Sequence, residues 1–289
     1  MKIRINMIKT ALICFLLSSV LSGCATVIPI EKSPGTLNLQ SKSWSKSQPV
    51  KNVIAIVSPK VTSNSVVARA QTQAPVSQNP FAAMMMQRMN TQNIDFNFNS
   101  AFSTNYSVSL NKALESSISE VVTSKGFKLK GPYSVFDDIT YQDKKRIYLA
   151  LVPEFDFSIN RKIINQKKHR LYTHTKGIIQ IGGSLTVSMM EPMTGQVFIK
   201  RRINLSDFNI EEPYIREKQT HRGGNGLIGT ALDKGTAPDK LIDTTDVALT
   251  NAVNAFYVKA IDKIYSYIDK EEILSFNEDV LKLKGLKRF

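Results

Sequence analysis

The chain has 289 residues, enough for one large domain or two small ones, and its 38 lysines and arginines against 24 aspartates and glutamates give a formal net charge of +14 at pH 7. This balance favours anionic partners such as lipid phosphates, acidic glycans and nucleic acid. Both cysteines lie within the first 24 residues, which excludes a disulfide framework or a cysteine metal site in the rest of the chain.

The N-terminus has the pattern of a lipoprotein signal peptide. Basic residues in MKIRINMIKT precede the apolar run ALICFLLSSVLSG, which is too short to cross a bilayer as a stable helix. The lipobox Leu21-Ser22-Gly23-Cys24 then predicts removal of residues 1–23 and acylation of the Cys24 thiol; the alternative is a cysteine that merely follows a signal peptide. Two or three acyl chains give a durable anchor. Ala25 favours the outer membrane as the destination, where the protein would rarely meet nucleic acid.

A tether, a strand and an insertion are expected next. Residues 24–51 are rich in Ser, Lys and Pro without a period, which is typical of a flexible tether with a reach of about 30 Å; Trp44 within it is expected to dock on the body or on the membrane. The β-branched apolar run NVIAIVSP at 52–59 predicts a buried central strand. Residues 60–102 are expected to be a mobile insertion, and their Met-rich patch at 81–86 either binds a partner or folds back onto the core.

The following segment predicts a β-α-β unit. Apolar residues recur at helical spacing from Tyr106 to Val121, and Gly126 stands where the chain leaves such a helix. A short strand at 127–130 comes directly after it. Strand, helix and strand in this order favour a parallel pair of strands joined by a crossover helix.

The remainder of the body predicts three long strands and a long helix. Period-2 alternation over 147–159, 179–189 and 197–205 is typical of an antiparallel meander with one buried face. After a polar, Gly-rich region at 206–242 comes an amphipathic helix that Asp243 or Thr244 can cap. Its core stripe contains Leu249, Val253, Phe256, Ala260, Ile264 and Ile268.

Together these elements predict one α/β (α+β) domain at 52–275, followed by a basic C-terminal tail at 276–289. The expected architecture is a mixed sheet with an N-terminal β-α-β unit, a long antiparallel meander and a long C-terminal helix packed on one face.

No catalytic or metal site emerges from the sequence. GNGLIG at 224–229 fits G-x-G-x-x-G, but no strand precedes it, so we interpret the match as chance. His169 and His174 lie in a stretch without carboxylates, 157–190, and are expected to be solvent-exposed imidazoles, as is His221. Neither a Ser-His-Asp order nor G-x-S-x-G stands out. We therefore expect a non-enzymatic protein without a metal or cofactor.

The densest positive charge is RKIINQKKHR at 161–170, which lies between two predicted strands and is expected to form a hairpin tip or connecting loop. Guanidinium groups grip carboxylates through paired hydrogen bonds, and an aromatic ring packs against a sugar face, so this stretch suits an acidic sugar such as sialic acid. Two alternatives remain open: contact with a phosphate-rich membrane surface, and solvated charge that prevents edge pairing. The candidate glycan-binding residues are Arg161, Lys162, Gln166, Lys167, Lys168, Arg170 and Tyr172, with Lys176 adding charge nearby.

Several blocks of the sequence resemble the neuraminyllactose-binding hemagglutinin family, surface lipoproteins of Gram-negative gastric bacteria. The resemblance runs from about residue 52 to the end, and the chain looks like a divergent paralogue. Its most specific blocks are TVSMMEPMTGQ (186–196), NLSDFNIEE (204–212), THRGG (220–224), IDKIYSYIDK (261–270) and LKGLKR (283–288). The resemblance implies a lipoprotein of the outer membrane, cell surface or flagellar sheath that acts as an adhesin for sialylated glycans.

The basic motif of that family, Lys-Arg-Thr-Ile-Gln-Lys-Lys, corresponds here to Arg161, Lys162, Ile163, Ile164, Gln166, Lys167 and Lys168. In this chain the first two basic residues are swapped, Ile163 replaces the hydroxyl residue, and Asn165 is inserted. The rival class is an envelope accessory or structural lipoprotein, similar to the curli-secretion-channel type. Such a protein would form homo-oligomers, or bind protein partners or an anionic membrane surface, without recognising sugar.

Overall fold

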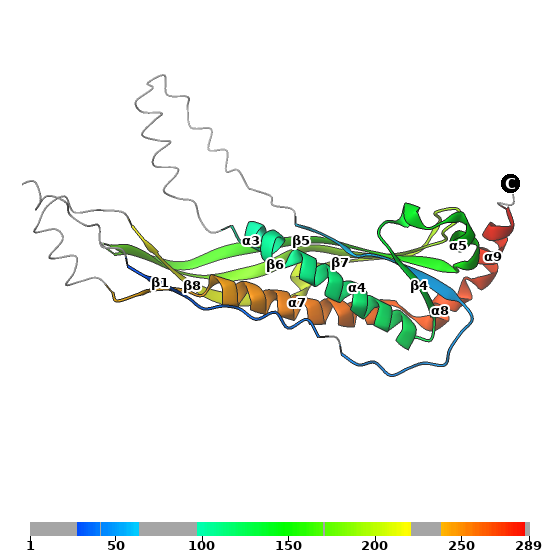
Figure 1. Ribbon diagram of the computed structural model, residues 1–289, viewed down its shortest axis with the longest axis horizontal. Coiled ribbons are helices and arrows are strands. Elements are labelled where there is room, and N and C mark those ends of the chain that lie inside the picture. Colours follow the sequence, from blue (N-terminus) through cyan, green and yellow to red (C-terminus); the bar gives the residue numbers. More distant parts are fainter. Residues whose placement is uncertain (1–27, 41, 64–96, 170, 221–237, 287–289) are drawn as a thin grey trace, which may run out of the picture. The chain divides into compact units, whose positions relative to one another are not determined.

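The computed structural model describes residues 28–40, 42–63, 97–169, 171–220 and 238–286 (Figure 1). Its strands within these ranges are β1 (Ile30–Lys32), β2 (Val53–Val57), β3 (Lys60–Ser63), β4 (Lys128–Tyr133), β5 (Leu149–Lys168), β6 (Tyr172–Met190), β7 (Val197–Asn204), β8 (Glu211–Gln219) and β9 (Leu241–Asp243). Its helices are α3 (Phe98–Asn105), α4 (Ser107–Ser124), α5 (Tyr141–Arg146), α7 (Thr245–Tyr267), α8 (Lys270–Ser275) and α9 (Asn277–Leu286), with 3₁₀ turns at Phe136–Asp138 and Leu205–Phe208.

The strands of the described residues pair into one mixed sheet. Neighbouring strands follow the order β1-β9-β8-β6-β5-β2-β4, while β3 pairs with β5 and β7 pairs with β6. Parallel pairs join β1 to β9 and β2 to β4, and antiparallel pairs join β6 to β7 and β8 to β9. The predicted α+β class with a mixed sheet is therefore confirmed.

The chain divides into two compact units. Unit 1 comprises Met1–Gly35, Lys162–Ile178 and Pro213–Ala248; unit 2 comprises Thr36–Arg161, Ile179–Glu212 and Leu249–Phe289. The single domain predicted at 52–275 would contain parts of both units. Unit 1 has a small hydrophobic cluster of its own, formed by Ile28, Leu171 and Leu241 with Tyr172 packed against it.

The predicted β-α-β unit is present in unit 2. The apolar strand β2 pairs in parallel with β4 on one side, with Ile54 opposite Leu129, and with β5 on the other, with Ile54 opposite Leu149. The connecting helix α4 buries Leu110, Leu114, Ile118 and Val121, the helical stripe expected from the sequence. Gly126 has φ +91°, so it supplies the left-handed conformation that lets the chain leave the helix.

The meander is present, but two of its strands are longer than predicted. In β5, Phe155, Phe157 and Ile159 are buried while the residues between them are partly or fully exposed, as the alternation requires. β6 pairs antiparallel with β7, with Val187 opposite Arg201. β5 continues to Lys168 and β6 begins at Tyr172, because cross-strand pairing extends the hairpin through residues that lack an apolar face.

The long helix α7 closes the core of unit 2 with the predicted stripe. Phe256 is fully buried and its ring lies edge-on to Phe157, with centroids 5.0 Å apart. The expected basic tail at 276–289 is corrected over its described part, which forms the helix α9. That helix buries Val280, and the ammonium of Lys284 donates to the backbone carbonyl of Ile147.

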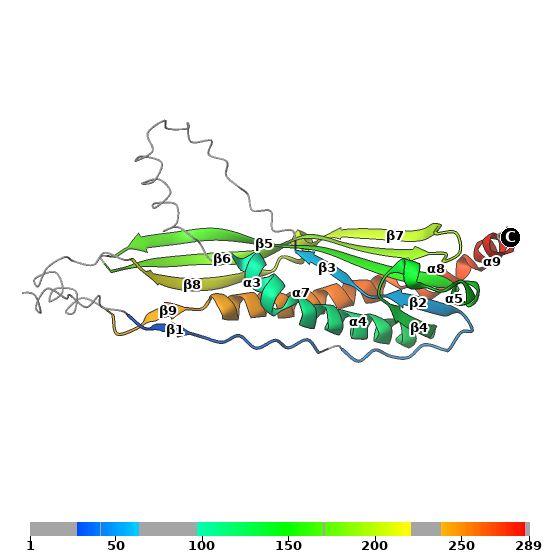
Figure 2. The ribbon, with the colours of Figure 1, turned by 45° about the horizontal axis from the view of Figure 1, so that its top comes forward.

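The segment expected to be a flexible tether lies on the body over its described residues. Residues 36–40 and 42–51, called the N-terminal strap below, run beside α7 and α4 (Figure 2). The Asn38 N–H donates to Asn254 Oδ1 at 2.8 Å, and the Val50 N–H donates to the Gly126 carbonyl at 2.8 Å. In the described part of the predicted tether, partners distant in sequence thus satisfy backbone groups that composition alone leaves to solvent.

Unit 1 contains strands that the sequence did not reveal. β8 and β9 lie in the region interpreted as polar connection, 206–242, and β1 lies in the predicted tether. They surround a small core of Ile28, Leu171 and Leu241, with Tyr172 packed against it. Part of the predicted insertion also has regular structure, since β3 and the first residues of α3 (98–102) lie within 60–102. The Met-rich patch at 81–86 and the glycine motif at 224–229 lie outside the described residues.

Candidate functional site

The basic stretch is a strand and not a loop. Residues 161–168, called the basic strand segment below, form the last part of β5. The turn that follows is closed where the His169 N–H donates to the Tyr172 carbonyl at 2.8 Å. The prediction of a hairpin is therefore correct, but the charges lie along one arm of it and not at its tip.

Every residue of the basic strand segment is exposed to solvent. The exposure includes its two isoleucines, Ile163 at 40% and Ile164 at 65%. Adjacent side chains in a strand point to opposite faces of the sheet. Both faces of this segment are therefore open, which is unlike the earlier part of β5, where one face is buried.

This geometry divides the predicted glycan site. Lys167 and Lys168 are neighbours in the strand and project from opposite faces, as do Arg161 and Lys162. The Gln166 amide donates across the hairpin to Thr175 Oγ1 at 3.3 Å. Arg170 lies outside the described residues. The predicted residues of the segment follow one another along an extended strand, and alternation prevents neighbours from converging on one small ligand.

The ring of Tyr172 makes contacts within unit 1. Its ring stacks on the His169 imidazole, with centroids 4.5 Å apart and an interplanar angle of 11°. It also packs against the cluster of Ile28, Leu171 and Leu241 and is half-buried. Tyr172 therefore has structural contacts in addition to the sugar stacking predicted for it.

Two carboxylates of unit 1, Glu217 and Asp243, have partners outside the basic strand segment. Glu217 Oε1 lies 2.7 Å from His174 Nδ1, and Glu217 Oε2 accepts from the Ile242 N–H at 2.9 Å. His174 is therefore a paired, largely covered imidazole and not the exposed one expected, since the carboxylate comes from β8, 43 residues away. Asp243 accepts from Thr245 and pairs with Arg216.

The lysines of the hairpin keep their charge uncompensated. Within the described ranges, no carboxylate pairs with Lys162, Lys167, Lys168 or Lys176, whereas Glu31 pairs with Lys240 at 2.8 Å. Unpaired ammonium groups on an exposed strand give a local positive potential that attracts anions. Binding of an anion is thus the chemistry that this arrangement offers.

The side chain of Asn99 caps the backbone of β5 at Ile159. Its side chain accepts from the Ile159 N–H at 2.8 Å and donates to the Ile159 carbonyl at 3.1 Å, as a neighbouring strand would. Within the described residues, β3 pairs with β5 at residues 154–157. For the part of β5 after Ile159, the neighbour among the described strands is β6. The sequence holds no signal for this edge cap, because its partner is 60 residues away.

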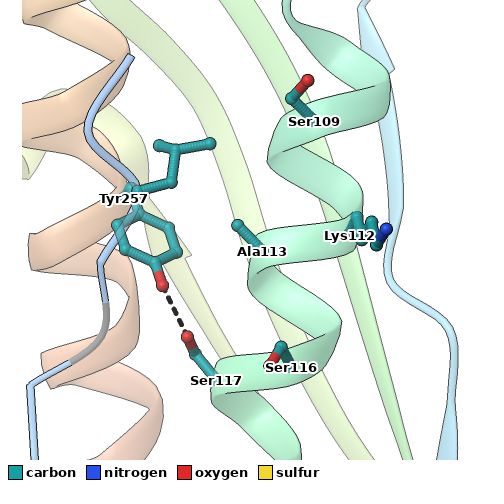
Figure 3. Close-up of a pocket in the computed structure, with 7 residues that line it drawn as sticks. Ser109, Lys112, Ala113, Ser116, Ser117 and Tyr257 are labelled. Carbon is teal, nitrogen blue, oxygen red and sulfur yellow. Dashed lines mark hydrogen bonds between the residues drawn. The ribbon is translucent and has the colours of Figure 1, made fainter.

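A second candidate is a surface pocket of about 360 Å³ in unit 2 (Figure 3). Its walls come from α4, α7 and the N-terminal strap, and its lining residues are Leu39, Ser109, Lys112, Ala113, Ser116, Ser117 and Tyr257. The hydroxyls of Ser117 and Tyr257 are 2.5 Å apart and buried, so they satisfy each other. Lys112 is the charged group in the lining, and the pocket therefore favours a small polar or anionic molecule.

Metal binding and membrane crossing find no support in the described parts of the chain. No three histidine, cysteine, aspartate or glutamate side chains in those parts lie close enough together to hold a metal ion. Among the helices there, each is either too short or too polar to cross a membrane.

Comparison with known proteins gives a family. Residues 90–287 match the family model described as neuraminyllactose-binding hemagglutinin precursor. The chain is 24% identical over 178 residues to the neuraminyllactose-binding hemagglutinin of Helicobacter pylori strain 26695, a match that covers 58% of this chain and 65% of that protein. It is 23% identical to the protein of the same name from strain J99 over the same shares. The match thus spans somewhat less than two thirds of these relatives.

A solved structure supports the fold. The crystal structure of a neuraminyllactose-binding hemagglutinin homologue from Helicobacter pylori aligns with a TM-score of 0.50 and 13% identity, over 84% of this chain and 99% of that one. At this identity the likeness concerns the fold alone. The family model covers well over half of the sequence, and the family expected from the sequence blocks is confirmed. The chain belongs to the neuraminyllactose-binding hemagglutinin family.

Proposed function

We propose that the protein is a non-catalytic adhesin, lipid-anchored at Cys24 in the outer membrane, that binds sialylated glycans through the basic strand segment. The relatives from Helicobacter pylori are named for binding neuraminyllactose, a sialylated sugar. The observation that carries the proposal is the uncompensated charge of Lys162, Lys167 and Lys168 on a fully exposed strand, with the nearby carboxylates engaged elsewhere.

The proposed contact is electrostatic and shallow. An exposed ammonium group such as that of Lys162 donates to the sialic acid carboxylate. Exposed charge pairs of this kind are weakened by salt, so affinity should fall as ionic strength rises. A contact on an open strand also predicts weak binding per site, as expected for adhesins that act in many copies.

Calorimetry of the protein with 3′-sialyllactose and with lactose tests the glycan. We expect saturable heat with the sialylated sugar alone, a loss of at least tenfold in affinity in Arg161→Gln/Lys162→Gln, and little change in Lys46→Gln/Lys128→Gln. The control pair removes the same charge from exposed sites of unit 2. Absence of heat with both sugars, or equal losses in both double variants, would refute glycan binding by this segment.

The lipid anchor is tested separately. We expect the intact mass of protein extracted from membranes to correspond to a chain that begins at Cys24 and carries acyl groups. Cys24→Ser should abolish both the processing and the membrane retention. A Cys24→Ser protein that is processed and retained in the membrane fraction like the wild type would refute the anchor. This outcome does not depend on the result with the glycan.

A further inference from the structure

The first described residue of the chain is fixed next to the turn that ends the basic strand segment. Ile28 is buried against Leu171, in the turn itself, and against Leu241. Its N–H donates to Gln219 Oε1 at 3.2 Å, and the Leu241 N–H donates to the Pro29 carbonyl at 2.8 Å. All of these residues belong to unit 1, so the relationship does not depend on how the two units are placed.

Only three residues, Ala25, Thr26 and Val27, lie between Cys24 and Ile28, which makes four steps from one Cα to the next. A fully extended chain spans at most about 3.6 Å per residue, so the Cys24 Cα lies within about 14 Å of the Ile28 Cα. A flexible tether that extended to residue 51 would have a reach of about 30 Å. Unit 1 does not have that distance from the anchor, because β1 already begins at Ile30 and is paired with β9. An acyl chain on Cys24 would hold this end of unit 1 at the membrane surface.

We propose that the β5–β6 turn stands on the membrane that holds the anchor, and that Lys167 and Lys168 contact the phosphates of anionic lipid headgroups there. The inference rests on the lipid anchor proposed above. It assigns the end of the basic strand segment to the protein's own membrane and not to an external ligand.

The alternation of the strand supports this partner. Lys167 and Lys168 project from opposite faces and cannot both line one small site. When a hairpin meets a plane end-on, however, side chains on both of its faces reach that plane. Both lysines are exposed and have no carboxylate partner within the described residues, which suits a surface of negative charge. Each lysine near such a surface strengthens the attachment about fivefold.

The proposal also gives the two ends of the basic strand segment different ligands. Arg161 and Lys162 lie about 20 Å further along the strand from Lys168, since each residue rises about 3.3 Å. They would stay clear of the headgroups, and the exposed Lys162 would remain available to a glycan. The candidate glycan site would then shrink to the part of the segment that is distant from the turn.

Fluorescence quenching in vesicles tests the proposal with the acylated protein. After acylation of Cys24 and loss of Cys14 with the signal peptide, a new cysteine is the single free thiol. A fluorophore on His169→Cys reports the turn, and one on Asn160→Cys reports the strand about 30 Å away. Vesicles contain phosphatidylcholine with or without phosphatidylglycerol, and a quencher is attached to the headgroup of a tracer lipid.

We expect strong quenching at position 169 and weak quenching at position 160. Phosphatidylglycerol should increase the quenching at 169, and Lys167→Gln/Lys168→Gln should return it to the level seen with phosphatidylcholine alone. Lys46→Gln/Lys128→Gln should leave it unchanged. Equal quenching at both positions overturns the proposal. Quenching at 169 that changes neither with phosphatidylglycerol nor with the double substitution overturns it as well. A purified protein whose mass lacks acyl groups overturns it as well, and identifies the anchor as the step that failed.

Discussion

The indole of Trp44 stacks on the phenol ring of Tyr265, with ring centroids 4.0 Å apart and planes 10° from parallel. The Lys125 ammonium lies 3.7 Å from the centroid of the same tyrosine ring. Trp44 belongs to the N-terminal strap and Tyr265 to α7, so this stack fastens the strap to the helix. The sequence offered docking on the body or on the membrane for Trp44, and the structure places it on the body.

Replacing Trp44 should loosen the strap without unfolding the body. Aromatic pairs contribute about 0.5–1.5 kcal/mol beyond the area they bury, so Trp44→Ala should lower the free energy of unfolding by about 1–2 kcal/mol. Urea unfolding followed by circular dichroism measures this, and limited proteolysis should show earlier cleavage within the strap. Lys46→Ala, an exposed neighbour, is the control. Equal stability and equal cleavage of Trp44→Ala and wild type would contradict the docked strap.

Trp44 is the single tryptophan of the chain and therefore reports on the strap directly. In the native protein its emission should be blue-shifted relative to the unfolded chain, because the indole is half-buried against Tyr265. Gly126→Ala should shift this emission to the red. A Cβ at that position would come within 2.3 Å of the Gln48 carbonyl oxygen, and only displacement of the strap relieves the clash. Unchanged emission in Gly126→Ala would count against the described contact.

Two glycines with positive φ should respond very differently to alanine. Gly183 has φ +107°, and a Cβ there would lie 1.9 Å from the Asp156 carbonyl oxygen. Gly195 has φ +74°, and a Cβ there would meet no atom within 4 Å among the described residues. The left-handed conformation alone costs about 1–2 kcal/mol, which is the loss expected for Gly195→Ala. Gly183→Ala adds a backbone clash and should cost roughly 3 kcal/mol or more. Denaturant unfolding compares the two, and similar losses would contradict the close approach of β5 and β6.

The buried hydroxyl pair beneath the pocket gives a paired prediction. Tyr257→Phe leaves the Ser117 hydroxyl buried without its partner, which should cost about 1–2 kcal/mol of unfolding free energy. The double variant Ser117→Ala/Tyr257→Phe removes both polar groups and should recover most of that loss. Thermal and urea unfolding of the two single variants and the double variant test this coupling. Additive losses would show that the hydroxyls do not depend on each other.

The carboxyl group of Asp143 should cause part of the loss of unfolding free energy in acid. Its pKa is lowered from 3.8, first by the hydrogen bond from the Tyr133 hydroxyl at 2.8 Å and then by the Lys130 ammonium at 3.2 Å. A carboxyl group with a lowered pKa stabilises the native state above its unfolded value, and this contribution is lost as pH falls from there through the native pKa. Asp143→Asn should therefore be less stable than wild type at neutral pH, and the difference should vanish below the lowered pKa.

Urea unfolding of both proteins across that pH range measures the difference. Tyr133→Phe should reproduce part of the effect, because it removes the largest cause of the pKa shift. Burial, together with the same contact, raises the pKa of Tyr133 to about 12. A difference between Asp143→Asn and wild type that persists unchanged in acid would contradict the assigned role of the carboxylate.

Local patterns in the sequence were sufficient for the core of unit 2. The β-branched run at 52–59, the stripe of α4 and the stripe of α7 each follow the period of their element, and each buries the residues that the period selects. A period reports which face of an element is apolar, and that information is local. The family was likewise accessible, because its blocks are contiguous stretches such as 186–196 and 204–212.

The placement of the basic residues required the tertiary structure. Residues 161–168 have no apolar face, so no period identifies them as a strand; pairing with β6 alone makes them one. Once they are a strand, alternation separates Lys167 from Lys168 and divides a site that looks continuous in the sequence. The carboxylate on His174 and the amide that caps Ile159 come from residues 43 and 60 positions away.

By itself, the sequence determined the secondary-structure periods, the charge, the lipobox pattern and the family, since these depend on neighbours along the chain. Only the tertiary structure decided that the strap is docked, that β1, β8 and β9 complete the sheet, and that Ile28 packs beside the turn after the basic strand segment. Those facts are contacts between residues distant in sequence. Their free energy comes from burial and hydrogen bonds that exist only after the segments have met.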